Sequence, residues 1–256
     1  MILHPKIRIV NNFFLCYIPL VEEDRHLRER LSKIWEDPNF IPFFKQFAKR
    51  SPLLIKKGNI IFYEGDEPNK LYFIKSGFVK LYHLSQDGKD TVIYLYGPGG
   101  ILGIRALTSL DQCLKHNALA ITDVEIVTVS RKDYLDILCN YPEYLIDLLH
   151  VFIKRLNYTE RKLEGFITTD AKTRIASFFS DCAARFGRKN NGFITLPIPF
   201  THQLISEFVG SARETVTGAM KELEKEGILK IEKGKITVFN LKKLYNYSSI
   251  QTKTLK

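Results

Sequence analysis

The sequence predicts an α+β fold in which a small antiparallel β-roll, or jelly roll, precedes a long helix and a mostly helical C-terminal region. Three observations predict this order. Short runs of β-forming residues alternate with glycine turns between residues 50 and 140. A heptad-like apolar pattern follows over residues 141–165. Two apolar helical stripes joined by a glycine, and then a basic hairpin, lie within residues 166–256. The chain has 256 residues, enough for two domains with separate cores.

Composition and charge narrow the class of protein. Hydrophobic residues make up 45% of the chain, which excludes a mainly disordered protein. The net charge is +10, and residues 166–256 contribute most of it, with 15 Lys and Arg against 8 Asp and Glu. A field of this sign attracts polyanions such as nucleic acids, although membrane surfaces and acidic proteins are attracted too. The apolar run 13–21 contains Pro19 and is followed by a charged stretch, so we expect a cytoplasmic protein with no membrane partner.

Residues 1–49 form a predicted N-terminal extension that is partly helical. Within it, residues 22–35 have the spacing of a charged amphipathic helix. We expect this helix to pack on the domain that follows.

The predicted β-roll covers residues 50–140. Its strands are expected at 53–55, 60–63, 71–74, 78–84 and 91–96, each bounded by a glycine-containing turn or a similar break. The interior of such a roll is either a packed core or a pocket for a small ligand.

A single helix is predicted from about Pro142 to Gly165. Its apolar stripe has alternating spacings of four and three residues, with one polar position: Leu145, Leu149, Phe152, Leu156, Thr159 and Leu163. This pattern favours pairing with the same helix of a second copy, and the alternative is a helix packed on its own β-roll. Gly165, Thr168 and Thr169 are expected to form a hinge before Asp170, the predicted N-cap of a helix over 171–186.

The next two predicted helices are short and joined by a tight turn. Thr201 is placed to cap the first helix, and Gly210 supplies the positive φ that the turn needs. Ser211 is the expected N-cap of the second helix. That helix places Val216, Met220 and Leu223 inward, and it places Arg213, Glu214, Thr217 and Lys221 outward.

The outward face of the second helix has the chemistry of base recognition. An arginine fork matches the acceptors of guanine, and a glutamate accepts from the amino group of cytosine. The hairpin that follows has predicted strands at 228–231 and 236–239. Three lysines flank its Gly234 tip and can reach phosphates: Lys230, Lys233 and Lys235. The segment therefore favours binding of double-stranded DNA, and the alternative is a solvated, charged helical hairpin.

Two long stretches resemble one known family. GSARETVTGAMKELEKEGIL, followed by KGKITVFN, resembles the winged helix-turn-helix of the cyclic-AMP receptor protein and fumarate-nitrate reduction regulator (CRP/FNR) family of bacterial transcription factors. IIFYEGDEPNKLYFIKSGFVKLYHLSQDGKDTVIYLYGPGGILG resembles the sensor β-roll of that family. The resemblance covers about residues 50–245. It implies a homodimeric regulator that reads a palindromic site and that contacts RNA polymerase if it activates transcription.

The resemblance also assigns roles to residues. It implies base reading by Arg213 and Glu214. It implies phosphate contacts by six residues: Thr201, Gln203, Ser211, Thr215, Lys221 and Lys235. Gly218 stands where well-known members have a second base-reading arginine, so we expect a different half-site.

The resemblance implies a small-molecule effector, and the sequence argues against cyclic AMP. Members that bind cyclic nucleotides present Gly-Glu to the ribose and then Arg-Ser or Arg-Thr to the phosphate. Here Gly103 is followed by Ile104, and residues 114–118 contain no such arginine pair. We expect an acidic or aromatic metabolite near Gly103 and Ile104 that is contacted by Arg105, Lys115 or His116, or else an empty pocket.

The sequence offers few signals for metal binding, redox chemistry or enzymatic catalysis. Cys16, Cys113, Cys139 and Cys182 lack the spacing of metal ligands, so no metal or other cofactor is expected. A redox-responsive thiol is the alternative to idle cysteines. No paired nucleophile and base is found, which argues against an enzyme. A β-roll sensor that acts through a protein partner is the second alternative.

Overall fold

The computed structural model describes residues 50–85, 88–107, 112–142, 144–190, 192–232 and 234–249, all of which belong to one unit, Ile41–Lys256. The predicted helix over 22–35, Cys16 and Lys233 lie outside the described residues.

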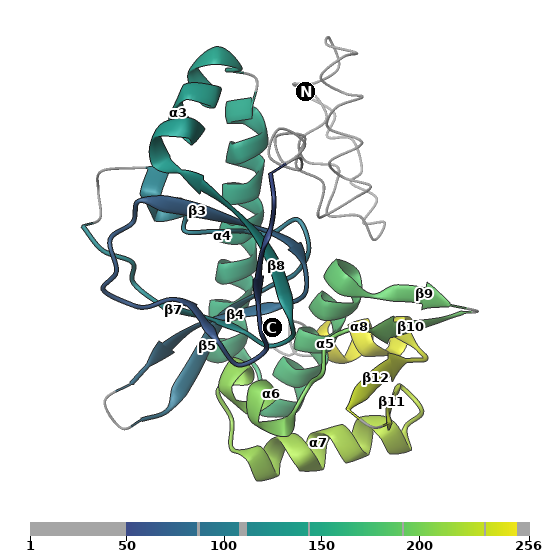
Figure 1. Cartoon of the computed structure of the whole chain (residues 1–256). Helices are drawn as coiled ribbons and strands as arrows, with labels where there is room; N and C mark the ends of the chain where they lie inside the picture. Colours follow the sequence, from purple (N-terminus) through teal and green to yellow (C-terminus); the bar gives the residue numbers. More distant parts are fainter. Residues whose placement is uncertain are drawn as a thin grey trace, which may run out of the picture. The chain divides into compact units, whose positions relative to one another are not determined.

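Two four-stranded antiparallel sheets make up the predicted β-roll (Figure 1), with strand orders β1-β8-β3-β6 and β2-β7-β4-β5. The strands are β1 (Leu53–Ile55), β2 (Ile60–Phe62), β3 (Lys70–Ser76), β4 (Val79–Leu84), β5 (Asp90–Tyr96), β6 (Ile101–Leu102), β7 (Asn117–Ala120) and β8 (Val124–Ser130). The five predicted strands are confirmed: the strand at 53–55 has the predicted bounds, and the other four are shifted by one or two residues at one or both ends. The sequence did not predict β6, β7 and β8.

Side chains from both sheets form a buried cluster inside the roll. Phe62, Ile74, Leu81, Tyr96 and Ile126 belong to one buried cluster, and they come from β2, β3, β4, β5 and β8. The alternation of inward and outward residues along each strand places these side chains on the facing surfaces.

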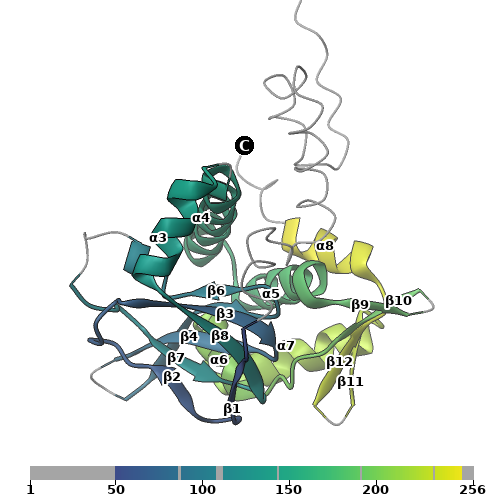
Figure 2. The ribbon, with the colours of Figure 1, turned by 45° about the horizontal axis from the view of Figure 1, so that its top comes forward.

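Two helices follow the roll and lie side by side in both views (Figures 1 and 2): α3 (Arg131–Asn140) and α4 (Tyr144–Thr168). The long predicted helix is confirmed, but the predicted hinge is partly wrong, because Gly165 and Thr168 lie inside α4. One glycine costs a helix only about 1 kcal/mol, and the Thr168 hydroxyl donates to the carbonyl of Glu164 at 2.8 Å. The non-helical junction is therefore limited to Thr169 and Asp170.

The C-terminal region combines four helices with a third antiparallel sheet of order β11-β12-β10-β9. Its elements are α5 (Ala171–Phe186), β9 (Arg188–Asn190), β10 (Phe193–Leu196), α6 (His202–Val209), α7 (Arg213–Lys225), β11 (Leu229–Glu232), β12 (Lys235–Val238) and α8 (Leu241–Ser249). Asp170 caps α5 as predicted, since its side chain accepts from the Thr173 N–H. In Figure 2, α8 lies against α5.

One buried cluster joins the outer face of the β4–β5 pair to α5 and α6. It includes Tyr82 and Leu95 from the strands and Phe178, Phe186 and Phe208 from the helices. Arg185 of α5 donates to the carbonyl of Leu95, and its guanidinium lies 4.4 Å from the centre of the Tyr94 ring. The β-roll and helices α5 and α6 therefore share a core.

Candidate nucleic-acid interface

The turn between α6 and α7 has the predicted geometry. The Thr201 side chain accepts from the Leu204 N–H at 3.0 Å and caps α6. Gly210 has φ 62° and ψ 49°, in the left-handed region, and its N–H donates to the carbonyl of Ser206. The left-handed residue ends α6 and redirects the chain into α7.

Ser211 does not cap α7, so that prediction is wrong. The helix begins at Arg213, and the N-cap position is Ala212, which has no side-chain acceptor. The Ser211 hydroxyl accepts instead from Nη2 of Arg174 at 3.0 Å. Nε of Arg174 donates to the carbonyl of Val209, also at 3.0 Å. A single side chain of α5 therefore fixes both ends of the turn.

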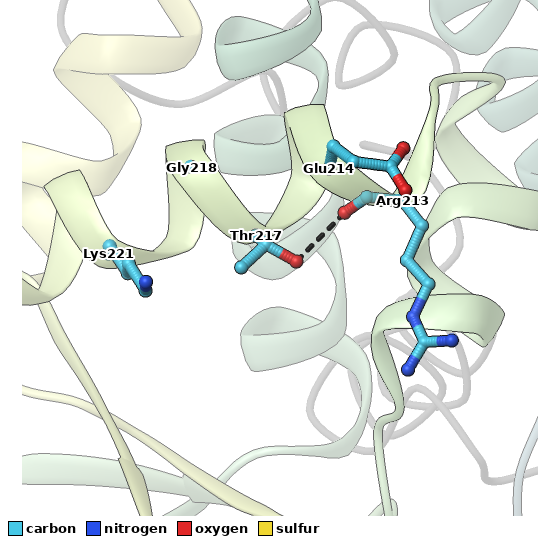
Figure 3. Close-up of a pocket in the computed structure, with 5 residues that line it drawn as sticks. All are labelled: Arg213, Glu214, Thr217, Gly218 and Lys221. Atoms are coloured by element: carbon cyan, nitrogen blue, oxygen red, sulfur yellow. Dashed lines mark hydrogen bonds between the residues drawn. The ribbon is translucent and has the colours of Figure 1, made fainter.

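The outward face of α7 is open. Val216, Met220 and Leu223 are buried as predicted, and Arg213, Glu214 and Lys221 are exposed. Arg213, Glu214, Thr217, Gly218 and Lys221 line an open hollow of about 450 Å³ (Figure 3). A Cβ atom added at Gly218 would meet no described atom within 4 Å beyond its own helix backbone. The outward face of α7 therefore carries one cation and one carboxylate in its first turn, and one turn later Gly218 leaves the backbone without a side chain.

Thr217 connects the two helices, a contact that the sequence analysis missed. Its hydroxyl donates to the carbonyl of Arg213 at 2.8 Å, and its Oγ1 lies 2.9 Å from Nδ1 of His202 (Figure 3 shows the first bond). Because a hydroxyl has one proton, Nδ1 of His202 is the donor in the second bond. The spacing of 15 residues between His202 and Thr217 gives no local signal for it.

The predicted phosphate-binding residues lie on α6, the turn, α7 and the hairpin. Thr201, Gln203, Thr215, Lys221 and Lys235 are exposed, and Ser211 is half-buried. Besides Thr201, whose hydroxyl caps α6, two of them are already hydrogen-bonded within the protein. The Ser211 hydroxyl is held by Arg174, and Nε2 of Gln203 donates to Oε1 of Glu207 at 2.9 Å.

The apolar stripe of α4 is exposed in the single chain. Leu145, Leu149, Phe152, Leu156 and Leu163 are between 38% and 60% exposed, and Thr159 is also exposed. Tyr158 on the opposite face is buried against Tyr94 of β5. The helix therefore packs on its own roll with one face and leaves the heptad stripe uncovered.

The predicted effector residues lie beside β6 and β7. Gly103 has φ 73°, and a Cβ atom there would lie 2.5 Å from the carbonyl oxygen of Lys70, so only glycine fits. Ile104 and Arg105 open a 3₁₀ helix, Ile104–Leu107. Lys115 is exposed, and its Nζ donates to Sγ of Cys113 at 3.5 Å.

His116 is half-buried, and burial lowers the pKa of its imidazole. The charges of Arg105 and Arg155 lower that pKa further. Arg155 of α4 also faces the rings of Tyr94 and Tyr96 at 5.6 and 5.9 Å. Arg105 and Arg155 therefore lie close enough to His116 to influence its ionisation, and the carboxylate of Glu64 opposes them by raising the same pKa.

The described ranges offer few candidates for a metal site, a reactive cysteine or a membrane-spanning helix. No three His, Cys, Asp or Glu side chains gather there in a way that would hold a metal ion. Cys182 is buried, and burial raises the pKa of its thiol, which disfavours the reactive thiolate. Cys113 is partly buried and Cys139 is exposed. None of the helices in the described ranges is long and apolar enough to cross a membrane.

A β-roll joined by a long helix to a winged helix-turn-helix defines a class of DNA-binding regulators, and comparisons with known proteins agree. The family model for the cyclic nucleotide-binding domain matches residues 52–141, and that for the Crp-like helix-turn-helix domain matches residues 173–247. The chain belongs to the CRP/FNR family of DNA-binding transcription regulators.

Individual relatives cover most of both chains. A CRP-like cAMP-activated global transcriptional regulator of Mycobacterium tuberculosis is 29% identical over 75% of this chain and 86% of its own length. A global nitrogen regulator of Synechococcus elongatus is 28% identical, with 79% and 93% covered. A crystal structure of a CRP/FNR-family transcriptional regulator from Thermus thermophilus is 28% identical, with a TM-score of 0.64 over 78% of this chain and 99% of that one. FixK2 from Bradyrhizobium japonicum shares the fold, with a TM-score of 0.68 at 22% identity over 77% of this chain and 96% of that one.

Proposed function

We propose that the protein is a homodimer that reads a palindromic DNA site and is controlled by a small molecule bound in its β-roll, other than cyclic AMP. In this proposal residues 50–140 sense the effector, 141–165 form the dimerisation helix and 166–256 bind DNA. The protein then works in the cytoplasm, where bacterial DNA lies. One observation carries the DNA-binding part of the proposal: Arg213 and Glu214 are exposed in the first turn of α7 and line the open hollow.

The first turn of a recognition helix enters the major groove, so its side chains meet base edges. We assign guanine reading to Arg213 and cytosine reading to Glu214, each worth roughly 1 to 3 kcal/mol of discrimination. Phosphate contacts are assigned to Thr201, Gln203, Ser211, Thr215, Lys221 and Lys235. These contacts set the position of the helix and its dependence on salt.

The homodimer follows from the exposed stripe of α4. Leu149 and Leu156 lie on this stripe, and pairing it with a second copy would remove both side chains from water. A two-fold axis then presents two recognition helices to successive major grooves, about 34 Å apart. A palindromic site is the expected target.

The effector is proposed to be an anionic metabolite. Arg105 and Arg155 are close enough to His116 for their charges to lower its pKa, and Lys115 adds a third cationic side chain nearby in sequence. Ile104 has no acceptor for a ribose hydroxyl, which disfavours cyclic AMP. A thermal-shift screen of acidic metabolites and nucleotides tests this, and stabilisation by cyclic AMP alone would contradict it.

DNA recognition is tested by selecting bound duplexes from a random library with the purified protein. We expect enrichment of two inverted half-sites whose centres lie about one helical turn, or 10 to 10.5 base pairs, apart. Binding without an enriched sequence would contradict base reading. Enrichment of a single half-site would contradict the dimer.

A further inference from the structure

A continuous chain of polar contacts runs from the β-roll to the DNA-facing end of α6. Oδ2 of Asp90 on β5 accepts from Nζ of Lys80 on β4 at 2.6 Å. The same Nζ donates to Oε2 of Glu207 on α6 at 3.0 Å. The other oxygen of Glu207, Oε1, accepts from Nε2 of Gln203 at 2.9 Å. Each oxygen of the Glu207 carboxylate thus has one partner, and the two partners belong to different parts of the chain.

The centre of this chain is shielded from water. The side chains of Lys80 and Glu207 are 10% and 11% exposed. Burial alone would lower the pKa of Lys80, but hydrogen bonds to Asp90 and Glu207 outweigh that effect and raise it above its ordinary value. Lys80 is therefore a charged group between two carboxylates. In such a setting removal of one partner leaves an uncompensated charge.

Gln203 is exposed in the first turn of α6, where we have assigned a phosphate contact. Its amide nitrogen has two N–H groups, and one of them is used by Glu207. A carboxylate that holds one N–H fixes which end of the amide is nitrogen and leaves the second N–H for an anion. Without that carboxylate the amide can rotate and present its oxygen, which repels phosphate.

Phe208, which follows Glu207 in α6, is held by a separate set of contacts. The ring of Phe208 lies 3.8 Å below Nζ of Lys162 from α4, and the same Nζ donates to the carbonyl of Val92 on β5 at 2.7 Å. We expect this contact, together with the shared apolar core, to keep α6 against β5 when the Lys80 ion pair is removed. The effect of Lys80 on Gln203 is thus separable from docking of the helix.

We propose that Glu207 is a positioning residue for DNA binding, that it acts by orienting the Gln203 amide toward a phosphate, and that Lys80 of the β-roll holds Glu207 in the required position. This inference rests on the phosphate contact proposed for Gln203. It makes DNA affinity depend on a β-roll residue that lies outside the helix-turn-helix.

The test is a double-mutant cycle of Lys80→Met and Gln203→Ala, with affinity measured by fluorescence anisotropy on a duplex selected by the wild-type protein. We expect Lys80→Met to weaken binding about fivefold in the wild-type background and less than twofold when Gln203 is already alanine, because residues in one network are not additive. Lys80→Arg keeps the positive charge and N–H donors for both carboxylates, and it should retain affinity within about twofold. Lys56→Met removes an exposed β-roll lysine and serves as the control for loss of one positive charge.

Glu207→Asp provides a second route if Lys80→Met lowers the yield of folded protein. Aspartate is one methylene shorter and cannot reach both partners, so its effect should also disappear in the Gln203→Ala background. Equal losses in both backgrounds, or no loss from Lys80→Met and Glu207→Asp, would overturn the inference. Failure of the wild-type protein to select any DNA would instead overturn the proposed function.

Discussion

The ring of Phe166 closes over the backbone of Gly210, so that a Cβ atom at Gly210 would lie 2.8 Å from Cε1 of the ring. Phe166 belongs to the last turn of α4, and Gly210 is the turn between α6 and α7. The guanidinium of Arg174 lies 5.4 Å from the same ring and donates to the carbonyl of Val209. Helix α4, which carries the proposed dimerisation stripe, is therefore in direct contact with the turn that sets the direction of the recognition helix.

Gly210→Ala is expected to destabilise the protein. A residue other than glycine in the left-handed region costs roughly 1 to 2 kcal/mol, and the new methyl group would also displace Phe166. We expect the free energy of unfolding to fall by about 2 kcal/mol in urea titrations. In a Phe166→Ala background the loss should shrink to the backbone contribution alone, and an unchanged stability in both backgrounds would contradict this account.

Gly218→Ala is the same substitution as Gly210→Ala at a different glycine, and it is expected to stabilise the protein. Gly218 lies in the middle of α7, and no φ strain or described neighbour opposes a methyl group there. Alanine is favoured over glycine in a helix by about 1 kcal/mol, so the free energy of unfolding should rise by 0.5 to about 1 kcal/mol. The same urea titrations measure it. A decrease would show that Gly218 has a packing role that the structure does not contain.

Lys162 makes stability depend on pH. Burial lowers its pKa to about 8, whereas an unfolded lysine titrates near 10.4. Between these values the unfolded chain binds the proton more strongly than the folded chain, so the contribution of Lys162 to the free energy of unfolding rises with pH. Relative to Lys162→Met, the wild-type protein should gain about 1 to 2 kcal/mol between pH 8 and pH 10.

Urea unfolding of both proteins at several pH values measures this difference. Lys56→Met is the control, because Lys56 is exposed and pairs with Asp123 at the surface. A difference between wild type and Lys162→Met that stays constant over the window would contradict the burial of a charged amine at this position.

Leu156→Glu is expected to break the homodimer. Leu156 is 56% exposed in the single chain and lies on the α4 stripe, so pairing would bury a carboxylate against its symmetry mate. We expect the dimer to dissociate at least about tenfold more readily in sedimentation equilibrium, since each 1.4 kcal/mol is a factor of ten. Asn157→Glu adds the same charge outside the stripe and should leave the assembly unchanged. Dimers of equal stability in both variants would place the interface elsewhere.

The parts of the fold that depend on local patterns could be predicted from the sequence. The cap at Thr201, the left-handed Gly210 and the inward positions Val216 and Leu223 of α7 are determined within a few residues, and the structure confirms them. The hinge prediction failed only at Gly165 and Thr168, because one glycine costs a helix about 1 kcal/mol and the Thr168 hydroxyl bonds to the preceding turn.

The contacts that long-range packing decides could not be predicted. Serine is a preferred residue type at an N-cap, but the Ser211 hydroxyl is bound by Arg174, 37 residues earlier. Lys80 and Glu207 are 127 residues apart, and each read alone is an ordinary charged residue. Such pairs depend on how β4 and α6 pack, which no periodicity in either element encodes. The roles assigned to individual DNA-contacting residues stay predictions.

The most direct test of the central claim compares the wild-type protein with Arg213→Ala on selected duplexes that carry every single base-pair change in one half-site. Arg213 should read one guanine, so the wild type should lose about tenfold or more in affinity when that base pair is changed, and Arg213→Ala should bind all four variants at that position alike. Preferences at the other positions, and dimerisation, should be retained. Unaltered preferences at every position in Arg213→Ala would contradict base reading by α7.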